Sequence, residues 1–228
     1  MTGFLASVAN LAEARMVCDA GVDIVDLKNP ATGALGALPL PMIETIVREL
    51  KGSVPISATV GDLPMIPAIV HEAVRATAAT QVDYVKIGFF PDGNDQFVID
   101  ALAKLAGDTR LIAVLFADQV PDPAIISRLA AAGFAGVMLD TMDKSRGSLT
   151  AVATMDELRD FVGLASELDL LCGLAGSLRE DDIPDLLPLR PDYLGFRGAL
   201  CARNARTATL EPGRLAAIRQ SIACPQPA

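Results

Sequence analysis

Three of the five lysines in this 228-residue chain recur at equal spacing, and they are the first candidates for chemistry. Lys28, Lys86 and Lys144 lie 58 positions apart, and two acidic residues, Asp26 and Asp140, stand close to the outer pair. A lysine crowded by other cations and partly withdrawn from water loses its proton more easily, so its amine can attack a carbonyl and form a Schiff base. The iminium then acidifies the adjacent carbon, where a second lysine or a carboxylate can accept the proton. The pattern therefore predicts amine chemistry on a carbonyl substrate.

Alternation along the flanking apolar runs predicts that these side chains share one interior space. Val25 and Leu27 would face a helical layer, which turns Asp26 and Lys28 to the opposite side. The same alternation predicts inward positions for Lys86, Met138 and Asp140, and it leaves Lys144 in the following loop. Buried charges are costly unless they are paired, so a structural alternative is that these residues form salt bridges that only hold the fold together.

Eight short apolar runs could position this cluster, because they alternate with segments of helical periodicity along the whole chain. The runs begin at Phe4, Asp23, Pro55, Tyr84, Arg110, Gly136, Leu170 and Tyr193. Eight such units predict one α/β domain over residues 1–228, a single (β/α)8 TIM barrel, with the lysines after the second, fourth and sixth strands. A doubly wound open sheet is the alternative, but no G-x-G-x-x-G turn follows the first run.

Three loops at the same end of the predicted barrel are candidates for substrate contacts. The segment 29–41 is rich in Gly and Pro, and a loop of this length could close over substrate or simply connect two elements. After the last two strands, Gly176, Ser177, Arg197 and Gly198 are expected to bind a phosphate, because loops at these positions commonly do so. Ser177 could instead cap a helix together with Glu180.

Composition narrows the remaining possibilities. A net charge of −9 and only 4% aromatic residues exclude a typical nucleic-acid binder. A single His and four scattered cysteines leave no material for a common metal centre, so we expect no metal and no cofactor. No apolar run reaches membrane-spanning length, and no signal segment stands at the N-terminus, so we expect a cytoplasmic protein without membrane contact. The acidic, apolar-rich composition suits a homo-oligomer.

Several blocks together resemble the (5-formylfuran-3-yl)methyl phosphate synthase family over nearly the whole chain. These blocks are DIVDLKNPATGALGA, YVKIGF, GVMLDTMDKSRGSL, GLAGSL and GFRGALC. The resemblance implies a lysine-dependent barrel enzyme that condenses two molecules of glyceraldehyde 3-phosphate, with loss of phosphate and water, in methanofuran-type cofactor biosynthesis. It also implies Lys28 as the Schiff-base former, Lys86 as the proton acceptor, and supporting roles for Asp26, Asp140 and Lys144.

Two other functions fit the residues without the resemblance. A class I aldolase or triose-phosphate lyase would use the same lysines on the same barrel. A non-catalytic protein that binds a phosphate ligand would need only the glycine loops, since a fold alone does not specify a function. The furan product and the carbon–oxygen lyase activity therefore come from the resemblance, whereas the amine cluster and the phosphate loops come from the residues.

Overall fold

The computed structural model describes residues 1–91 and 93–223, and in them eight parallel strands close into a barrel in sequence order, as predicted. The strands are β1 Gly3–Val8, β2 Ile24–Leu27, β3 Ile56–Thr59, β4 Tyr84–Gly88, β5 Leu111–Phe116, β6 Gly136–Asp140, β7 Leu171–Leu174 and β8 Tyr193–Phe196. β1 pairs with β8 through Gly3–Ala6 and Tyr193–Phe196, which completes the ring. A barrel of this kind gathers the carboxyl ends of all strands at one mouth.

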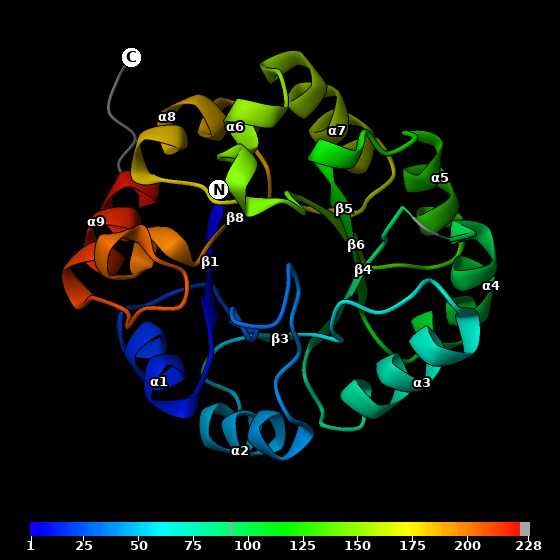
Figure 1. The fold of residues 1–228 in the computed structure, drawn as a ribbon, viewed down its shortest axis with the longest axis horizontal. Coiled ribbons are helices and arrows are strands. Elements are labelled where there is room, and N and C mark those ends of the chain that lie inside the picture. Colours follow the sequence, from blue (N-terminus) through cyan, green and yellow to red (C-terminus); the bar gives the residue numbers. More distant parts are fainter. Residues whose placement is uncertain (92, 224–228) are drawn as a thin grey trace.

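The helices form a ring around the strands (Figure 1). They are α1 Leu11–Asp19, α2 Leu40–Leu50, α3 Pro67–Ala78, α4 Asp95–Ala106, α5 Ala124–Ala131, α6 Leu149–Val152, α7 Met155–Glu167, α8 Ile183–Leu186 and α9 Pro212–Ala223. Short 3-10 helices lie between them, namely η1 Ala117–Gln119, η2 Lys144–Arg146, η3 Glu180–Asp182, η4 Leu187–Leu189, η5 Gly198–Leu200 and η6 Ala202–Asn204. η2 follows β6, and η5 and η6 follow β8, at the carboxyl ends of these strands.

The core has two parts, and strand alternation separates them. Val25, Leu27, Val85 and Ile87 belong to the large cluster between strands and helices. A smaller cluster, which includes Leu5, Val114, Phe116, Met138 and Tyr193, fills the barrel interior. The interior therefore takes the residues of opposite parity, as the sequence predicts for Met138 and for its charged neighbours.

Local sequence signals mark the starts of two helices. Thr154 and Glu157 form a capping box at the start of α7, and α9 begins at Pro212. The loop predicted over 29–41 ends earlier, because α2 begins at Leu40 with Pro41 in its first turn, where no backbone N–H is needed. Ser177 does not cap a helix with Glu180: η3 has Arg179 at its N-cap, and the N–H of Arg179 donates to Asp182 over 2.7 Å.

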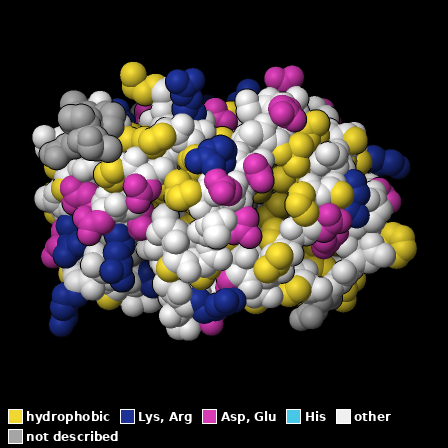
Figure 2. Space-filling model, turned by 90° about the horizontal axis from the view of Figure 1, so that it is seen from above, with side chains coloured by type: hydrophobic (Ala, Val, Ile, Leu, Met, Phe, Trp, Pro, Cys, Tyr) yellow, Lys and Arg dark blue, Asp and Glu magenta, His cyan; other side chains and the backbone are white. Residues whose placement is uncertain are grey.

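The outer surface mixes acidic, basic and apolar side chains, as the face in Figure 2 shows. An apolar cavity of about 420 Å³ lies in the helical layer, lined by Val120, Ile126, Phe161 and other residues of η1, α5 and α7. No helix among residues 1–91 and 93–223 has the length and apolar character needed to cross a bilayer.

Candidate active site

A second cavity of about 430 Å³ opens at the mouth of the barrel, at the carboxyl ends of the strands. Its walls contain most of the residues that the sequence singles out: Lys28, Lys86, Asp140, Lys144, Gly176, Ser177, Arg197 and Gly198. The remaining one, Asp26, lies beneath them with no exposed surface. The cavity in the helical layer has a similar volume but contains none of the lysines. The cavity at the barrel mouth is therefore the candidate active site.

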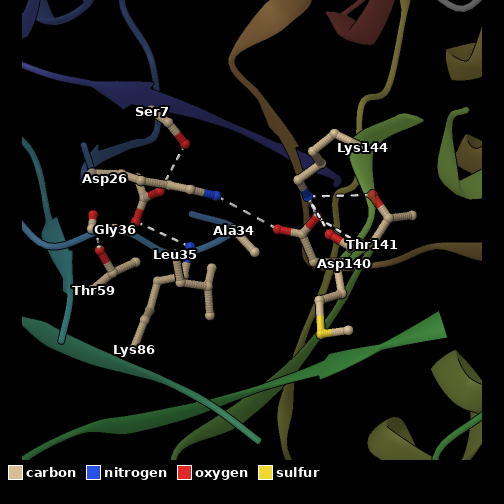
Figure 3. Close-up of polar contacts among 12 residues, drawn as sticks. Ser7, Asp26, Ala34, Leu35, Gly36, Thr59, Lys86, Asp140, Thr141 and Lys144 are labelled. Carbon is tan, nitrogen blue, oxygen red and sulfur yellow. Dashed lines mark hydrogen bonds and ion pairs between the residues drawn. The ribbon is translucent and has the colours of Figure 1, made fainter. Parts of the chain in front are cut away.

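Asp26 is the buried anchor of one half of the site. The hydroxyl of Ser57 donates to its carboxylate over 2.7 Å. The hydroxyl of Ser7 also donates to it over 2.7 Å, and Lys86 Nζ donates to Oδ1 over 3.0 Å (Figure 3). Burial alone would raise the pKa of Asp26, but the ammonium groups of Lys86 and Lys28 and the two hydroxyls outweigh it and lower the pKa. Asp26 is therefore a carboxylate that forms a buried ion pair with Lys86.

Strand register explains how Asp26 obtains these partners. Ser7 of β1 and Ser57 of β3 are the direct neighbours of Asp26 across the two parallel ladders. Sequence analysis missed both serines. They stand in apolar runs at positions of inward parity, so aligning the three runs by register would have identified them.

Asp140 anchors the other half of the site, at the end of β6. Lys144 Nζ lies 2.6 Å from Oδ1, and the N–H of Thr141 donates to the same oxygen over 2.7 Å (Figure 3). Lys144 also donates to the carbonyl and hydroxyl oxygens of Thr141. Burial opposes the charge on Asp140, but Lys144, Lys28 and the N–H of Thr141 together lower its pKa. Asp140 is thus ionised, and it fixes the ammonium of Lys144 at the rim of the cavity.

Lys28 lies between the two carboxylates and is the least tightly held of the three lysines. Its Nζ is 3.7 Å from Oδ2 of Asp140, and no described residue accepts a hydrogen bond from it. Burial is the main cause that lowers the pKa of Lys28 to about 8; Lys144 and Lys86 lower it further, while Asp140 and Asp26 act in the opposite direction. A neutral amine on this side chain is therefore accessible near neutral pH. The predicted cluster of three lysines and two aspartates does come together.

The glycine loop after β7 also lines the cavity. Gly176 has φ +107°, and a Cβ there would lie 2.9 Å from both the backbone N and Cγ2 of Thr141, so only glycine fits. Ser177 follows with φ +50° and an exposed side chain. Together with Gly198 after β8, this loop brings backbone close to the cavity, as a phosphate-binding loop does.

Arg197 does not have the free guanidinium that its predicted role requires. Its N–H groups donate to the Glu13 carboxylate, with a shortest N–O distance of 2.5 Å, and to three backbone carbonyls, those of Ser7, Arg206 and Ala208. Both side chains of the Arg197–Glu13 pair are about 10% exposed. All donors of Arg197 are thereby used within the protein, which contradicts a bidentate phosphate contact. Sequence alone concealed this, because Glu13 lies 184 residues away in α1.

The loop after Lys28 is pinned over the barrel rather than hanging free. Asp62 accepts hydrogen bonds from the N–H groups of Ala34 and Leu35, at 2.7 and 2.6 Å. Leu35 is fully buried in the interior cluster. Arg206 Nη2 donates to the carbonyl of Gly33 over 2.6 Å. The loop therefore fills part of the barrel top.

Metal binding has no visible basis in the described part of the chain, where no group of three or more His, Cys, Asp or Glu side chains could hold an ion. Cys172 is buried, and burial, reinforced by Asp192, raises the pKa of its thiol to about 12, so it is a packing residue. Cys224 lies outside the described residues.

Solved structures with this fold are distant in sequence. Phosphoribosyl anthranilate isomerase from Thermus thermophilus superposes with a TM-score of 0.69 at 15% identity and covers 98% of both chains. 3-hexulose-6-phosphate synthase from Salmonella typhimurium gives a TM-score of 0.70 at 17% identity, over 97% of this chain and 99% of its own. These neighbours support the barrel fold and nothing more specific.

Sequence relatives are more informative. A (5-formylfuran-3-yl)methyl phosphate synthase of Methanopyrus kandleri is 35% identical over 218 residues, 89% of this chain and 90% of its own. A Methanococcus maripaludis protein of the same name is 34% identical over 90% of this chain and 92% of its own. A Methylorubrum extorquens protein that carries the name provisionally is 41% identical over 93% of this chain and 88% of its own. Residues 4–219 also match the family model described as 4-HFC-P synthase, and the chain belongs to that family.

Proposed function

We propose that this protein condenses two molecules of glyceraldehyde 3-phosphate to (5-formylfuran-3-yl)methyl phosphate, with loss of phosphate and water, as a step of methanofuran-type cofactor biosynthesis. In this proposal it is a carbon–oxygen lyase acting on phosphates, and it forms a Schiff base. Family membership supports the product. The observation that carries the mechanism is Lys28, buried at the cavity with its pKa lowered to about 8.

Schiff-base formation follows from the protonation states of the two inner lysines. The neutral Nζ of Lys28 attacks the aldehyde carbon C1 of one triose phosphate and forms a carbinolamine. Lys86 lies in the same cavity and is held as an ammonium by Asp26, at 3.0 Å. It donates a proton to the carbinolamine hydroxyl, which leaves as water, and an iminium remains on Lys28.

Proton removal at C2 is the next step. After donating its proton Lys86 is neutral, so it can accept the C2 proton that the iminium has acidified, and this is the acceptor role expected for it. The electron pair of the C2–H bond forms a C2–C3 double bond as the C3–O bond to phosphate breaks. Addition of the second triose phosphate and loss of two further waters close the ring, and hydrolysis of the C1–N bond then returns one water and releases the aldehyde from Lys28. Loss of one phosphate and two waters in total balances the atoms.

Asp140 and Lys144 act at the outer side of the iminium. Asp140 lies 3.7 Å from Lys28 and stabilises the positive iminium, while Lys144 at 2.6 Å keeps the carboxylate oriented. Lys144 is partly exposed at the rim, so its ammonium can protonate the carbonyl oxygen of the incoming triose. Gly176, Ser177 and Gly198 hold a substrate phosphate by backbone N–H groups.

Product analysis with the purified protein tests this function. Incubation with glyceraldehyde 3-phosphate should release inorganic phosphate together with a furan aldehyde that absorbs in the ultraviolet. Borohydride added during turnover should leave a mass adduct on Lys28. Lys28→Arg should abolish both signals, whereas Lys104→Arg, on the exposed face of α4, should leave them unchanged. An aldol product without phosphate release would instead identify an aldolase, and saturable binding without conversion would identify a binding protein.

Localisation and assembly are separate predictions. A homo-oligomer is expected from composition, and sedimentation equilibrium of the purified protein checks it. Cell fractionation checks the expected cytoplasmic location.

A further inference from the structure

The proposed reaction brings two phosphate esters into one cavity, so one binding loop is not enough. The loop at Gly176 and Ser177 offers backbone to one phosphate. Three arginines also line the cavity, Arg179, Arg197 and Arg206. Arg197 has its donors engaged within the protein, and Arg179 is exposed at the edge. Arg206 is partly buried at the cavity wall, and only one of its donor nitrogens has a partner among the described residues.

Arg206 is held at two points while much of its guanidinium is left available. Nη2 donates to the carbonyl of Gly33 over 2.6 Å, and the carbonyl of Arg206 itself accepts from Nε of Arg197 over 2.7 Å. No described residue accepts a hydrogen bond from Nε or Nη1 of Arg206. A guanidinium fixed in this way presents a planar set of donors suited to a phosphate, with little rotamer entropy left to lose.

The backbone before Arg206 has an unusual conformation. Arg203 and Asn204 both have left-handed φ values, +55° and +56°, which non-glycine residues adopt at a cost. Asn204 is secured there, because its Oδ1 accepts from Nη1 of Arg214 over 2.9 Å. Residues 204–207 then form part of the cavity wall.

The contact of Arg206 reaches the loop that follows the nucleophile. Gly33 belongs to the loop that follows Lys28 directly, and the N–H of Asn29 closes that loop on the carbonyl of Gly36 over 2.7 Å. We propose that Arg206 is a second phosphate subsite, which binds the phosphate of one of the two triose phosphates and thereby fixes the loop that carries Lys28. The proposal rests on the proposed function for the identity of the substrate, but the anion contact can be measured without turnover.

Binding of glycerol 3-phosphate is the direct test, because this probe carries the phosphate but has no aldehyde and cannot form a Schiff base. Calorimetric titrations should compare the full-length protein with Arg206→Gln and with Arg203→Gln. Arg203 lies three residues away, is exposed and does not line the cavity, so its removal changes the net charge equally without touching the subsite.

We expect Arg206→Gln to weaken glycerol 3-phosphate binding about tenfold or more, the usual effect of losing a charged hydrogen bond, and Arg203→Gln to leave it unchanged. With glyceraldehyde 3-phosphate, KM should rise in Arg206→Gln by a similar factor. Equal affinities in all three proteins would overturn the proposal. If Arg206→Gln does not fold, Arg206→Lys decides by the same comparison, since a single ammonium retains the charge but not the planar donors.

Failure of the two proposals would look different. A wild-type protein that binds glycerol 3-phosphate through Arg206 but releases no furan would refute the proposed function and leave the subsite standing. A wild-type protein that makes the furan, with an unchanged KM in Arg206→Gln, would refute the subsite alone.

Discussion

Lys28 and Asp140 form a long ion pair, with 3.7 Å between Nζ and Oδ2, inside a site where both side chains are buried. The other oxygen of Asp140 is taken by Lys144 at 2.6 Å and by the N–H of Thr141. Asp140 therefore divides its charge between two lysines and does not fully compensate the burial of Lys28. The consequence is an amine whose pKa is lowered to about 8, which a tight pair with Asp140 would have prevented.

The pH dependence of kcat/KM should follow the Lys28 amine. Only the neutral amine attacks a carbonyl, so we expect kcat/KM to rise with pH up to about pH 8 and then to level off. Asp140→Asn removes a carboxylate that raises the pKa of Lys28, so the rising limb should move to lower pH. Initial rates and borohydride trapping measured from pH 6 to 10 check this. A profile that does not change between pH 6.5 and 8.5 would contradict it.

Replacing Lys28 with methionine should stabilise the protein while it abolishes turnover. The folded pKa of about 8 lies below the ordinary value of 10.5, so between these pH values the unfolded chain binds a proton that the folded chain does not. The wild type should therefore gain stability as the pH rises from 8 to 10.5, and below pH 8 the buried ammonium costs on the order of 1–3 kcal/mol.

Urea unfolding at pH 7 and at pH 10.5 checks this difference. Lys28→Met should exceed the wild type at pH 7, because Lys144 keeps Asp140 paired, and the gain should shrink at high pH. Lys104→Met is the control, since Lys104 is exposed and its stability change should not depend on this pH interval. A lower stability of Lys28→Met at pH 7 would show that the ammonium is better compensated than its contacts indicate.

The barrel could be predicted because its strands and helices have simple periodicities. The parity of Val25 and Leu27 against Asp26 and Lys28 decided the orientation of β2, and the same rule placed Lys86 and Asp140. The direction of a side chain in a strand can be inferred from the residues next to it in the sequence. The loops were less predictable: Leu35, from a segment expected to be a lid or a connector, fills the barrel interior because Asp62 binds the backbone beside it.

Asp26 and Lys86 should depend on each other for stability. Asp26→Asn leaves the buried ammonium of Lys86 without a carboxylate, so we expect a loss of about 3–5 kcal/mol in the free energy of unfolding. The double variant Asp26→Asn with Lys86→Met removes both charges and should recover much of that loss, but not activity. Denaturant unfolding of the two single variants and the double variant measures the coupling. Simple additivity of the single losses would show that the pair is not energetically linked.

Lys86→Arg separates charge from proton transfer at the same position. An arginine keeps the ion pair with Asp26 but does not lose its proton in the relevant pH range. We expect turnover to fall by about a hundredfold or more, the usual contribution of a general acid or base, while the far-ultraviolet circular dichroism spectrum is retained. Wild-type rates in this variant would remove Lys86 from the proton transfers.

Arg197 shows where inference from sequence fails for a physical reason. Its parity and its place after β8 fit a phosphate ligand, but its partner Glu13 comes from the first helix. Long-range pairs of this kind depend on how the closed ring brings β8 and α1 together, which no local pattern reports. Ser7 and Ser57 were missed for a related reason, because their importance lies in register with Asp26 and not in their own neighbours.

Arg197 should therefore behave as a structural residue. Arg197→Met leaves the buried carboxylate of Glu13 unpaired, and we expect a loss of about 3 kcal/mol or more in stability. The double variant with Glu13→Gln should be less destabilised than the sum of the two single variants. Thermal unfolding checks this coupling. If Glu13→Gln loses no stability while Arg197→Met loses only phosphate affinity, then Arg197 binds substrate after all.

Gly176 links the proposed phosphate loop to the lysine cluster through Thr141. A Cβ at position 176 would lie 2.9 Å from the backbone N and Cγ2 of Thr141, whose oxygens hold Lys144, and the left-handed φ of +107° adds strain. Gly176→Ala should thus raise KM for the triose phosphate and lower the free energy of unfolding by more than about 1 kcal/mol.

Gly213→Ala is the matched control, because a Cβ there meets no atom of the described residues within 4 Å and the residue lies in the first turn of α9. Steady-state kinetics and urea unfolding of both variants decide the matter: equal behaviour would show that the loop at Gly176 tolerates a side chain and is not fitted to a phosphate.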